Sequence, residues 1–228
     1  MKVEELLRAF SVPEEFIESR PGRQGVASFH NYRSEYNNDT KLIEQIIQSA
    51  KELRWLIICS PVSGRGKSHL AVAAMRLSYH HDQHPVRRNK EVNFEQAFLD
   101  PITMTSYPPK AYRFLSVRRT GQELAMAGVG LPKMLDSLLN HKRCLLLDEL
   151  GLEPDSAISR IELILEDVFN SRGQIIATTP LTPEQLIARY NLSIIRRIED
   201  RGEIISLPGG QTFRVEENQV PLLRIAGG

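Results

Sequence analysis

A phosphate-binding loop is predicted by six consecutive residues, which are Ser63, Gly64, Arg65, Gly66, Lys67 and Ser68. Glycines let backbone N–H groups turn inward around a phosphate, and a helix that begins there adds its partial positive charge. In such a loop Lys67 would reach the β- and γ-phosphates, and the Ser68 hydroxyl would ligate Mg²⁺. Pro61 occupies the place of the first glycine in the full G-x-x-x-x-G-K-[ST] pattern, so an ordinary strand-to-helix turn is the alternative.

A second candidate group lies about 80 residues further on, where the apolar run Cys144–Leu147 ends in Asp148 and Glu149. A carboxylate at the tip of a buried strand is costly unless a cation meets it. Mg²⁺ held by Ser68 would be that cation, with Asp148 as its protein contact and Glu149 as the base that orients and deprotonates the attacking water. Two solvated acids would be the plainer interpretation.

Two further groups have side chains suited to phosphate chemistry. Thr178 and Thr179 end another apolar run, so either hydroxyl could reach the γ-phosphate, although threonine is also a common strand residue. Arg196, Arg197 and Arg201 lie on a short predicted helix, where one of them could stabilise transition-state charge on a neighbouring subunit's nucleotide. A solvated basic face is the alternative for these arginines.

The elements that would position these residues alternate between apolar strands and amphipathic helices, which predicts a parallel α/β sheet. Ligands of such sheets bind at the carboxyl ends of the strands, where both candidate motifs lie. The expected strands are 55–59, 111–117, 143–148 and 174–178. The expected helices are 1 to about 20, 39–52, 67 to about 79, 131–140, 158–169, 183–190 and 193–201, together with a helix capped by Thr120 and a hairpin around Gly209-Gly210.

Composition sets wide limits on the class of protein. The 228 residues carry 29 basic and 28 acidic side chains, a net charge of +1, which gives no overall attraction to nucleic acid or membranes. Cys59 and Cys144 lie in apolar runs and are expected to be buried free thiols. No stretch is long and apolar enough for a membrane span and the start lacks a signal peptide, so we expect a cytoplasmic protein without a membrane partner.

The stretch 80–110 has no clear hydrophobic period and is expected to be an irregular insertion. Its histidines, His80, His81 and His84, have few neighbouring ligands and fit a solvated loop better than a metal site. Basic residues could form a nucleic-acid patch around aromatic side chains, or could be ordinary surface charges. These residues are Arg87, Arg88, Lys90, Arg113, Arg118 and Arg119, with Tyr107, Tyr112 and Phe114.

Over residues 12–215 the chain resembles the AAA+ helicase-loader and transposition-helper ATPases of the DnaC/IstB type. The matching segments are Val12–Phe16, Phe29–Tyr32, Gly64–Ala71, Leu147–Gly151, Ile175–Leu186 and Arg196–Arg201. The resemblance implies a three-layer α/β/α P-loop fold with a short N-terminal helix and a C-terminal β-hairpin. It also implies an ATPase that binds single-stranded or duplex DNA as a homo-oligomer and hands over a replicative helicase or a transposase.

By position, the resemblance assigns nucleotide contacts to Ser63 through His69, metal contacts to Ser68 and Asp148, and catalytic roles to Lys67, Glu149, Thr179 and the arginine finger Arg197. Family members usually have Thr-Ser-Asn where this chain has Thr178-Thr179-Pro180. The asparagine that senses the γ-phosphate is thus absent, and Thr179 or Thr178 would have to replace it.

The leading hypothesis is an ATP- and Mg²⁺-dependent helper of DNA replication or transposition, most like a helicase loader. A nucleotide-gated adaptor with little hydrolysis is the main alternative, motivated by Pro61 and the missing asparagine. A small-molecule kinase is a third, against which the intersubunit finger argues. The expected layout is an N-terminal helical segment (1–25), an ATPase core (26–215) with the insertion at about 80–110, and a C-terminal tail (216–228).

Overall fold

The computed structural model describes residues 2–18, 25–29, 31–32, 40–83, 111–126 and 143–208. Its strands are β1 Trp55–Cys59, β2 Tyr112–Ser116, β3 Cys144–Asp148, β4 Gln174–Thr179 and β5 Gly202–Ser206. Its α-helices are α1 Val3–Ala9, α2 Thr40–Lys51, α3 Lys67–Gln83, α5 Val117–Met126, α7 Ile158–Asn170, α8 Pro183–Arg189 and α9 Leu192–Arg201. Two short 3-10 helices, η1 Glu14–Phe16 and η6 Asp155–Ala157, complete the described elements.

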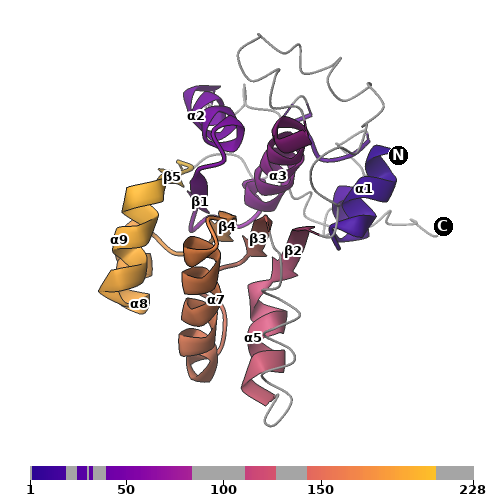
Figure 1. Ribbon diagram of the computed structural model, residues 1–228. Coiled ribbons are helices and arrows are strands. Elements are labelled where there is room, and N and C mark those ends of the chain that lie inside the picture. The colour runs from indigo at the N-terminus through magenta and orange to yellow at the C-terminus, as the bar shows by residue number, and fades with distance from the viewer. Residues whose placement is uncertain are drawn as a thin grey trace, which may run out of the picture.

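The five strands form one parallel sheet in the order β2-β3-β4-β1-β5. Helices cover both faces, with α1, α2 and α3 on one side and α5, α7 and α9 on the other (Figure 1). This arrangement confirms the predicted three-layer α/β fold of the P-loop AAA+ type. The strand that enters the phosphate-binding loop, β1, lies between β4 and β5, and β4 lies beside β3. The carboxyl ends of β1, β3 and β4 therefore meet at one edge.

Side chains alternate across the sheet and divide the core into two layers. Leu56 and Ile58 of β1 face α2 and α3, whereas Ile57 faces α7 and α9. This alternation follows from the two-residue period of a strand. All five residues of β1 are buried, as expected for a central strand that is covered on both faces.

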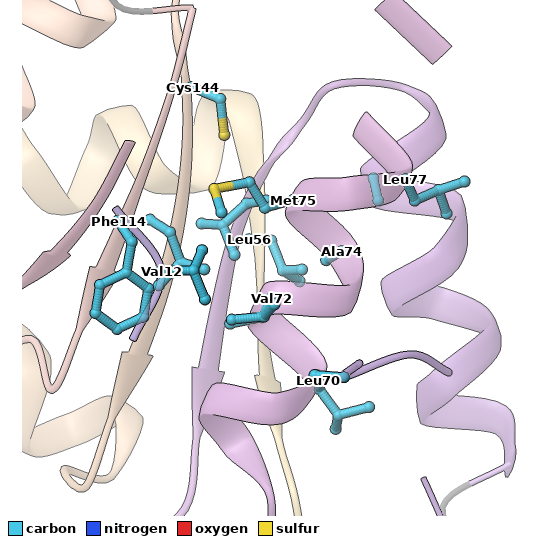
Figure 2. Close-up of a cluster of buried hydrophobic side chains, with 14 of the residues drawn as sticks. Val12, Leu56, Leu70, Val72, Ala74, Met75, Leu77, Phe114 and Cys144 are labelled. Carbon is cyan, nitrogen blue, oxygen red and sulfur yellow. The ribbon is translucent and has the colours of Figure 1, made fainter. Parts of the chain in front are cut away.

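The apolar layer between the sheet and helices α2 and α3 includes residues of the N-terminal segment. Figure 2 shows Val12 and Phe114 close to Met75 of α3 and Leu56 of β1 in one apolar cluster. Phe10 stacks on Tyr112 and meets the edge of Tyr79, and its carbonyl accepts a 2.7 Å hydrogen bond from the Phe114 N–H of the edge strand β2. The N-terminal helix is thus packed onto the sheet as part of its core.

Three boundaries differ from the sequence predictions, and the first is that of α1, which ends at Ala9 and not near residue 20. Helix α3 continues to Gln83, and His80 and His81 are buried in it, so the expectation that they belong to a solvated loop was wrong. Helix α5 begins at Val117, directly after β2, and Thr120 is therefore a buried helical residue and not a cap. The α5 error comes from a strand that runs directly into a helix with no glycine or proline between them, whereas the observed end of α3 agrees with Pro85, two residues after Gln83.

The structure describes only part of the hairpin that was predicted around Gly209-Gly210. The first strand expected for the hairpin is β5, which pairs in parallel with β1. The second expected strand lies outside the described residues, as do the expected helix 131–140, His84 and most of the insertion. Cys59 and Cys144 are both buried and free, as predicted. Within the described parts of the chain, no helix combines the length and the apolar character that crossing a membrane requires.

Candidate nucleotide-binding and hydrolysis site

The predicted phosphate-binding loop connects β1 to α3. Gly64 and Gly66 have positive φ angles of 77° and 80°, a conformation that glycine adopts at little cost. The loop begins in register with the sheet, because the Ser60 N–H donates a 3.0 Å hydrogen bond to the Thr179 carbonyl. The Lys67 ammonium donates to the Val62 carbonyl at 3.2 Å, so its side chain folds back across the loop. The loop forms a backbone cradle with a cation over it.

The Arg65 side chain contacts the residues that follow β5. It is fully buried, and its Nε donates to the Pro208 carbonyl at 3.0 Å, which ties the loop to the residues that follow β5. The Arg65 carbonyl accepts a 3.1 Å hydrogen bond from the Tyr32 hydroxyl. These two hydrogen bonds anchor the loop at Arg65, and a contact of Arg65 with a nucleotide stays a prediction.

His69 is likewise engaged by the N-terminal part of the chain. Its Nε2 lies 2.7 Å from the Ser28 carbonyl oxygen, and its ring is tilted against that of Tyr32 with the centroids 5.9 Å apart. Ser28 and Tyr32 therefore pack against the first turn of α3. A direct contact of His69 with a nucleotide stays a prediction. The structure adds Tyr32 as a neighbour of the loop, whereas from the sequence it was noted only as part of the family-like segment Phe29–Tyr32.

Asp148, at the carboxyl end of β3, contacts the phosphate-binding loop. The Ser68 hydroxyl donates a 2.6 Å hydrogen bond to Asp148 Oδ1, and the Thr178 hydroxyl donates to the same oxygen at 2.7 Å. Two residues separated by 80 positions in the sequence are thus in direct contact. Parallel pairing explains the contact, because β3 and β1 both end beside β4.

Glu149 follows in an unusual backbone conformation. Its φ is +64°, which is uncommon for a residue with a side chain. The turn is held by hydrogen bonds from the Glu149 N–H to the Thr178 hydroxyl (3.0 Å) and from the Leu150 N–H to the Thr178 carbonyl (2.7 Å). A half-exposed Glu149 carboxylate results, with Arg118 Nε at 3.8 Å from its Oε2. Arg118 is a neighbour that the sequence had suggested only as part of a basic patch.

The two threonines of β4 have different surroundings. Thr178 contacts Asp148 and the Glu149 backbone, whereas the fully buried Thr179 accepts a 3.1 Å hydrogen bond from the Leu181 N–H. The structure thus brings Thr178, and not Thr179, to the acidic pair. Strand alternation decides this, since adjacent residues point to opposite faces.

Arg197 and Arg201 of α9 contact residues of α7. Arg197 forms a 2.8 Å ion pair with Glu166, and its guanidinium is 5.1 Å from the Phe169 ring centroid. Arg201 covers the same ring at 4.0 Å and donates to the Phe169 carbonyl. Arg196 is exposed. These contacts lie within one subunit, and a finger role for Arg197 stays a prediction.

The suggested nucleic-acid patch loses two of its aromatic members. Tyr112 and Phe114 are 1% and 6% exposed and pack against Phe10 and Phe16. Side chains buried in this way are not available to stack on bases. Tyr107, Arg87, Arg88 and Lys90 lie outside the described residues.

The donor set fits a magnesium nucleotide. Mg²⁺ prefers hard oxygen ligands and takes one or two from the protein, with phosphate oxygens and water completing its shell. The hydroxyl of Ser68 and the carboxylate of Asp148 lie side by side at the end of the glycine loop and provide such oxygens. Cys59 lies at the end of β1, just before this loop. Burial raises the pKa of its thiol to about 12, and the nearby charge of Lys67 opposes this rise by a smaller amount.

The fold of this chain is similar to those of two solved proteins of DNA replication. A proposed primosome component from Streptococcus pyogenes serotype M3 aligns with a TM-score of 0.59 and 14% identity over 94% of this chain and 100% of its own. A DNA replication initiation factor aligns with a TM-score of 0.51 and 16% identity over 79% of this chain and 49% of its own. The chain shares its fold with these two proteins.

A DnaC helicase loader also aligns, at 20% identity over 75% of this chain and 89% of its own, with a TM-score of 0.49. No protein-family model matches the sequence. No curated protein sequence matches it either. At 14% and 16% identity, the likeness to the first two structures establishes a shared fold and not a function.

Proposed function

We propose that this chain binds and hydrolyses ATP with Mg²⁺ and acts as a helper of DNA replication or transposition, most like a helicase loader. The observation that carries the nucleotide part is the contact of Ser68 with Asp148 at the end of a glycine loop. A hydroxyl, a carboxylate and a loop lysine in this arrangement are what a Mg²⁺-nucleotide site requires.

In the proposed reaction, Lys67 and the loop N–H groups hold the phosphates, and Glu149 orients a water for attack on the γ-phosphorus. The new phosphorus–oxygen bond forms as the bond to the bridging oxygen breaks, which gives ADP and inorganic phosphate, and Glu149 takes the proton of the water. Mg²⁺ would neutralise charge on the phosphate oxygens. Thr178 fixes the backbone of Glu149 and so fixes where its carboxylate points.

The role in replication or transposition rests on two supports. One is the resemblance in the residues around the loop, the acidic pair and the arginines of α9, and the other is the fold shared with replication proteins. In this proposal the chain forms a homo-oligomer on DNA, Arg197 reaches a neighbour's nucleotide, and a replicative helicase or a transposase is the cargo.

A nucleotide-gated adaptor with little hydrolysis is the second candidate. Two observations favour it: Pro180 stands where the family usually has the asparagine that senses the γ-phosphate, and Glu149 has Arg118 beside it. In that case ATP binding alone would control assembly with a protein partner.

Phosphate release, measured with and without single-stranded DNA, separates the two candidates. The ATPase proposal expects turnover in the wild type, loss of nucleotide binding in Lys67→Ala, and retained binding without turnover in Glu149→Gln. Equal phosphate release by wild type and Glu149→Gln would contradict it. A wild type that binds ATP tightly and assembles without releasing phosphate would establish the adaptor.

A further inference from the structure

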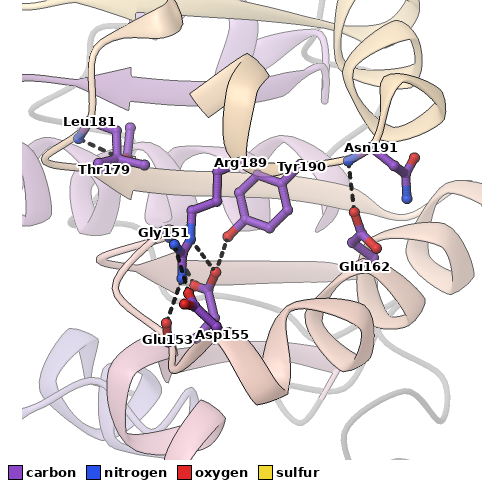
Figure 3. Close-up of polar contacts among 9 residues, drawn as sticks. All are labelled: Gly151, Glu153, Asp155, Glu162, Thr179, Leu181, Arg189, Tyr190 and Asn191. Atoms are coloured by element: carbon purple, nitrogen blue, oxygen red, sulfur yellow. Dashed lines mark hydrogen bonds and ion pairs between the residues drawn. The ribbon is translucent and has the colours of Figure 1, made fainter. Parts of the chain in front are cut away.

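A buried carboxylate lies four residues after the proposed catalytic base. The Glu153 side chain has no solvent-exposed surface, and a carboxylate placed there is costly unless several donors meet it. Three donors do so (Figure 3): the Gly151 N–H at 2.9 Å, Arg189 Nε at 2.9 Å and the Tyr190 hydroxyl at 2.8 Å. We call Gly151, Glu153, Arg189 and Tyr190 the Glu153 network.

The network joins the turn that carries Glu149 to the end of α8. Arg189 also donates to the Glu153 backbone carbonyl at 2.6 Å, so the guanidinium grips both the side chain and the main chain. Charge-assisted hydrogen bonds of this kind are stronger than neutral ones and fix orientation. Burial raises the pKa of the Tyr190 hydroxyl, and the neighbouring Glu153 charge adds to this rise, so the hydroxyl stays a donor at neutral pH.

The turn has little freedom to move by itself. Gly151 has φ +95°, and a Cβ built there would lie 2.5 Å from the Leu181 side chain. On the other side, α5 packs so closely that a Cβ at Gly121 would lie 2.6 Å from Glu153 Cβ. The turn is therefore enclosed between α5 and the residues that lead from β4 into α8.

Glu149 needs such support because its backbone is strained. A non-glycine residue with φ near +60° persists only where its surroundings impose that conformation. Thr178 supplies two hydrogen bonds on the β4 side of the turn, and the Glu153 network supplies the hydrogen bond to Gly151, two residues beyond Glu149. Loss of either support allows the turn to relax and the carboxylate to shift.

We propose that Glu153 is a positioning residue for the hydrolytic step: through Arg189 and Tyr190 it fixes the turn that aims Glu149, and it couples that turn to α8. The proposal rests on the proposed ATP hydrolysis for its kinetic consequence, but the fixing of the turn can be measured separately. Small displacements of a reacting group cost rate without a matching cost in substrate binding, because binding uses other contacts.

The test compares Tyr190→Phe with a matched control, Tyr112→Phe. Each change removes one hydroxyl from a buried carboxylate that an arginine also binds, since Tyr112 donates to Asp82 at 2.7 Å beside Arg143. The control pair lies at the amino ends of β2 and β3, away from Asp148. Both variants are expected to lose similar stability, because each leaves a buried carboxylate without one of its hydrogen-bond donors.

Tyr190→Phe is expected to lower kcat about tenfold while the dissociation constant for a fluorescent ATP analogue stays within about twofold. It is also expected to speed amide hydrogen exchange over residues 148–153. Tyr112→Phe should change neither property. Glu153→Gln should exceed the Tyr190→Phe effect, and Tyr190→Phe decides the case if the glutamine variant does not fold.

Unchanged exchange over 148–153 in Tyr190→Phe would overturn the inference whatever the ATPase assay shows. An equal fall in kcat in both tyrosine variants would also overturn it, since the effect would then be one of general stability. Faster exchange in Tyr190→Phe with no turnover in the wild type would instead refute the proposed hydrolysis and leave the fixing of the turn standing.

Discussion

The Ser68 hydroxyl donates a 2.6 Å hydrogen bond to Asp148 Oδ1, and this contact joins the glycine loop to the acidic strand end. The Thr178 hydroxyl shares the same oxygen. The contact places two oxygen donors suited to Mg²⁺ at the mouth of the phosphate cradle.

Asp148→Asn is expected to weaken nucleotide binding only when Mg²⁺ is present, because the amide is a poorer ligand for a hard cation than the carboxylate it replaces. The measurement is titration of a fluorescent ATP analogue in Mg²⁺ and in EDTA, with an expected loss of about tenfold or more in Mg²⁺. An equal loss in EDTA would mean that Asp148 acts on the loop itself.

Thr178→Val and Thr179→Val should have different consequences. Loss of the Thr178 hydroxyl leaves the Glu149 N–H without its acceptor and frees Asp148, so turnover should fall while nucleotide affinity is retained. Loss of the Thr179 hydroxyl removes the acceptor of the Leu181 N–H, which should lower the unfolding free energy by about 1 to 3 kcal/mol and spare kcat. A selective kcat defect in Thr179→Val would restore it as the catalytic threonine.

Arg118→Ala should leave stability nearly unchanged, because an exposed ion pair contributes at most about 1 kcal/mol. Turnover should rise by roughly two- to fivefold, because Arg118 no longer competes with the attacking water for the Glu149 carboxylate and one exposed ion pair is a weak contact. Phosphate release by Arg118→Ala and by the neighbouring Arg119→Ala, whose arginine pairs with Glu123, makes the comparison. A fall in turnover for Arg118→Ala alone would show that the arginine assists the reaction.

Arg197 can be tested by mixing two inactive variants. Arg197→Ala should retain nucleotide binding and lose turnover, as should Glu149→Gln, but mixed oligomers would contain sites that have both Glu149 and a neighbour's Arg197. Activity that appears on mixing supports an intersubunit site. A mixture that stays inactive, with Glu166→Gln matching Arg197→Ala in stability, would instead indicate that Arg197 acts only through its pair with Glu166.

Both cysteines should resist thiol reagents in the folded protein. Burial raises the pKa of Cys59 from 9.0 to about 12 and raises that of Cys144 as well, so almost no thiolate forms near pH 8. The stability that the neutral Cys59 thiol provides should be fully present below pH 9 and lost between pH 9 and about pH 12, where only the unfolded thiol ionises. Ellman's reagent before and after denaturation checks the first point, and fast labelling of native protein would contradict it.

The sequence by itself predicted four of the five described strands of the parallel sheet and named the candidate site residues. Continuous apolar runs at Trp55–Cys59 and Cys144–Leu147 are typical of strands buried on both faces, and the glycine loop and acidic pair directly follow such runs. The rule that ligands bind at the carboxyl ends of parallel strands then placed Ser68 and Asp148 together. Local patterns were enough because strand period and loop chemistry are local properties.

Only the tertiary structure decided which neighbours these residues have. Sequence patterns did not separate Thr178 from Thr179, because their faces depend on the register of β4 between β1 and β3. The same holds for Tyr32 beside the loop, Arg118 beside Glu149, and Arg189 and Tyr190 around Glu153. Each of these contacts joins segments that are distant in the chain, and packing of whole elements, which no local pattern encodes, brings them together.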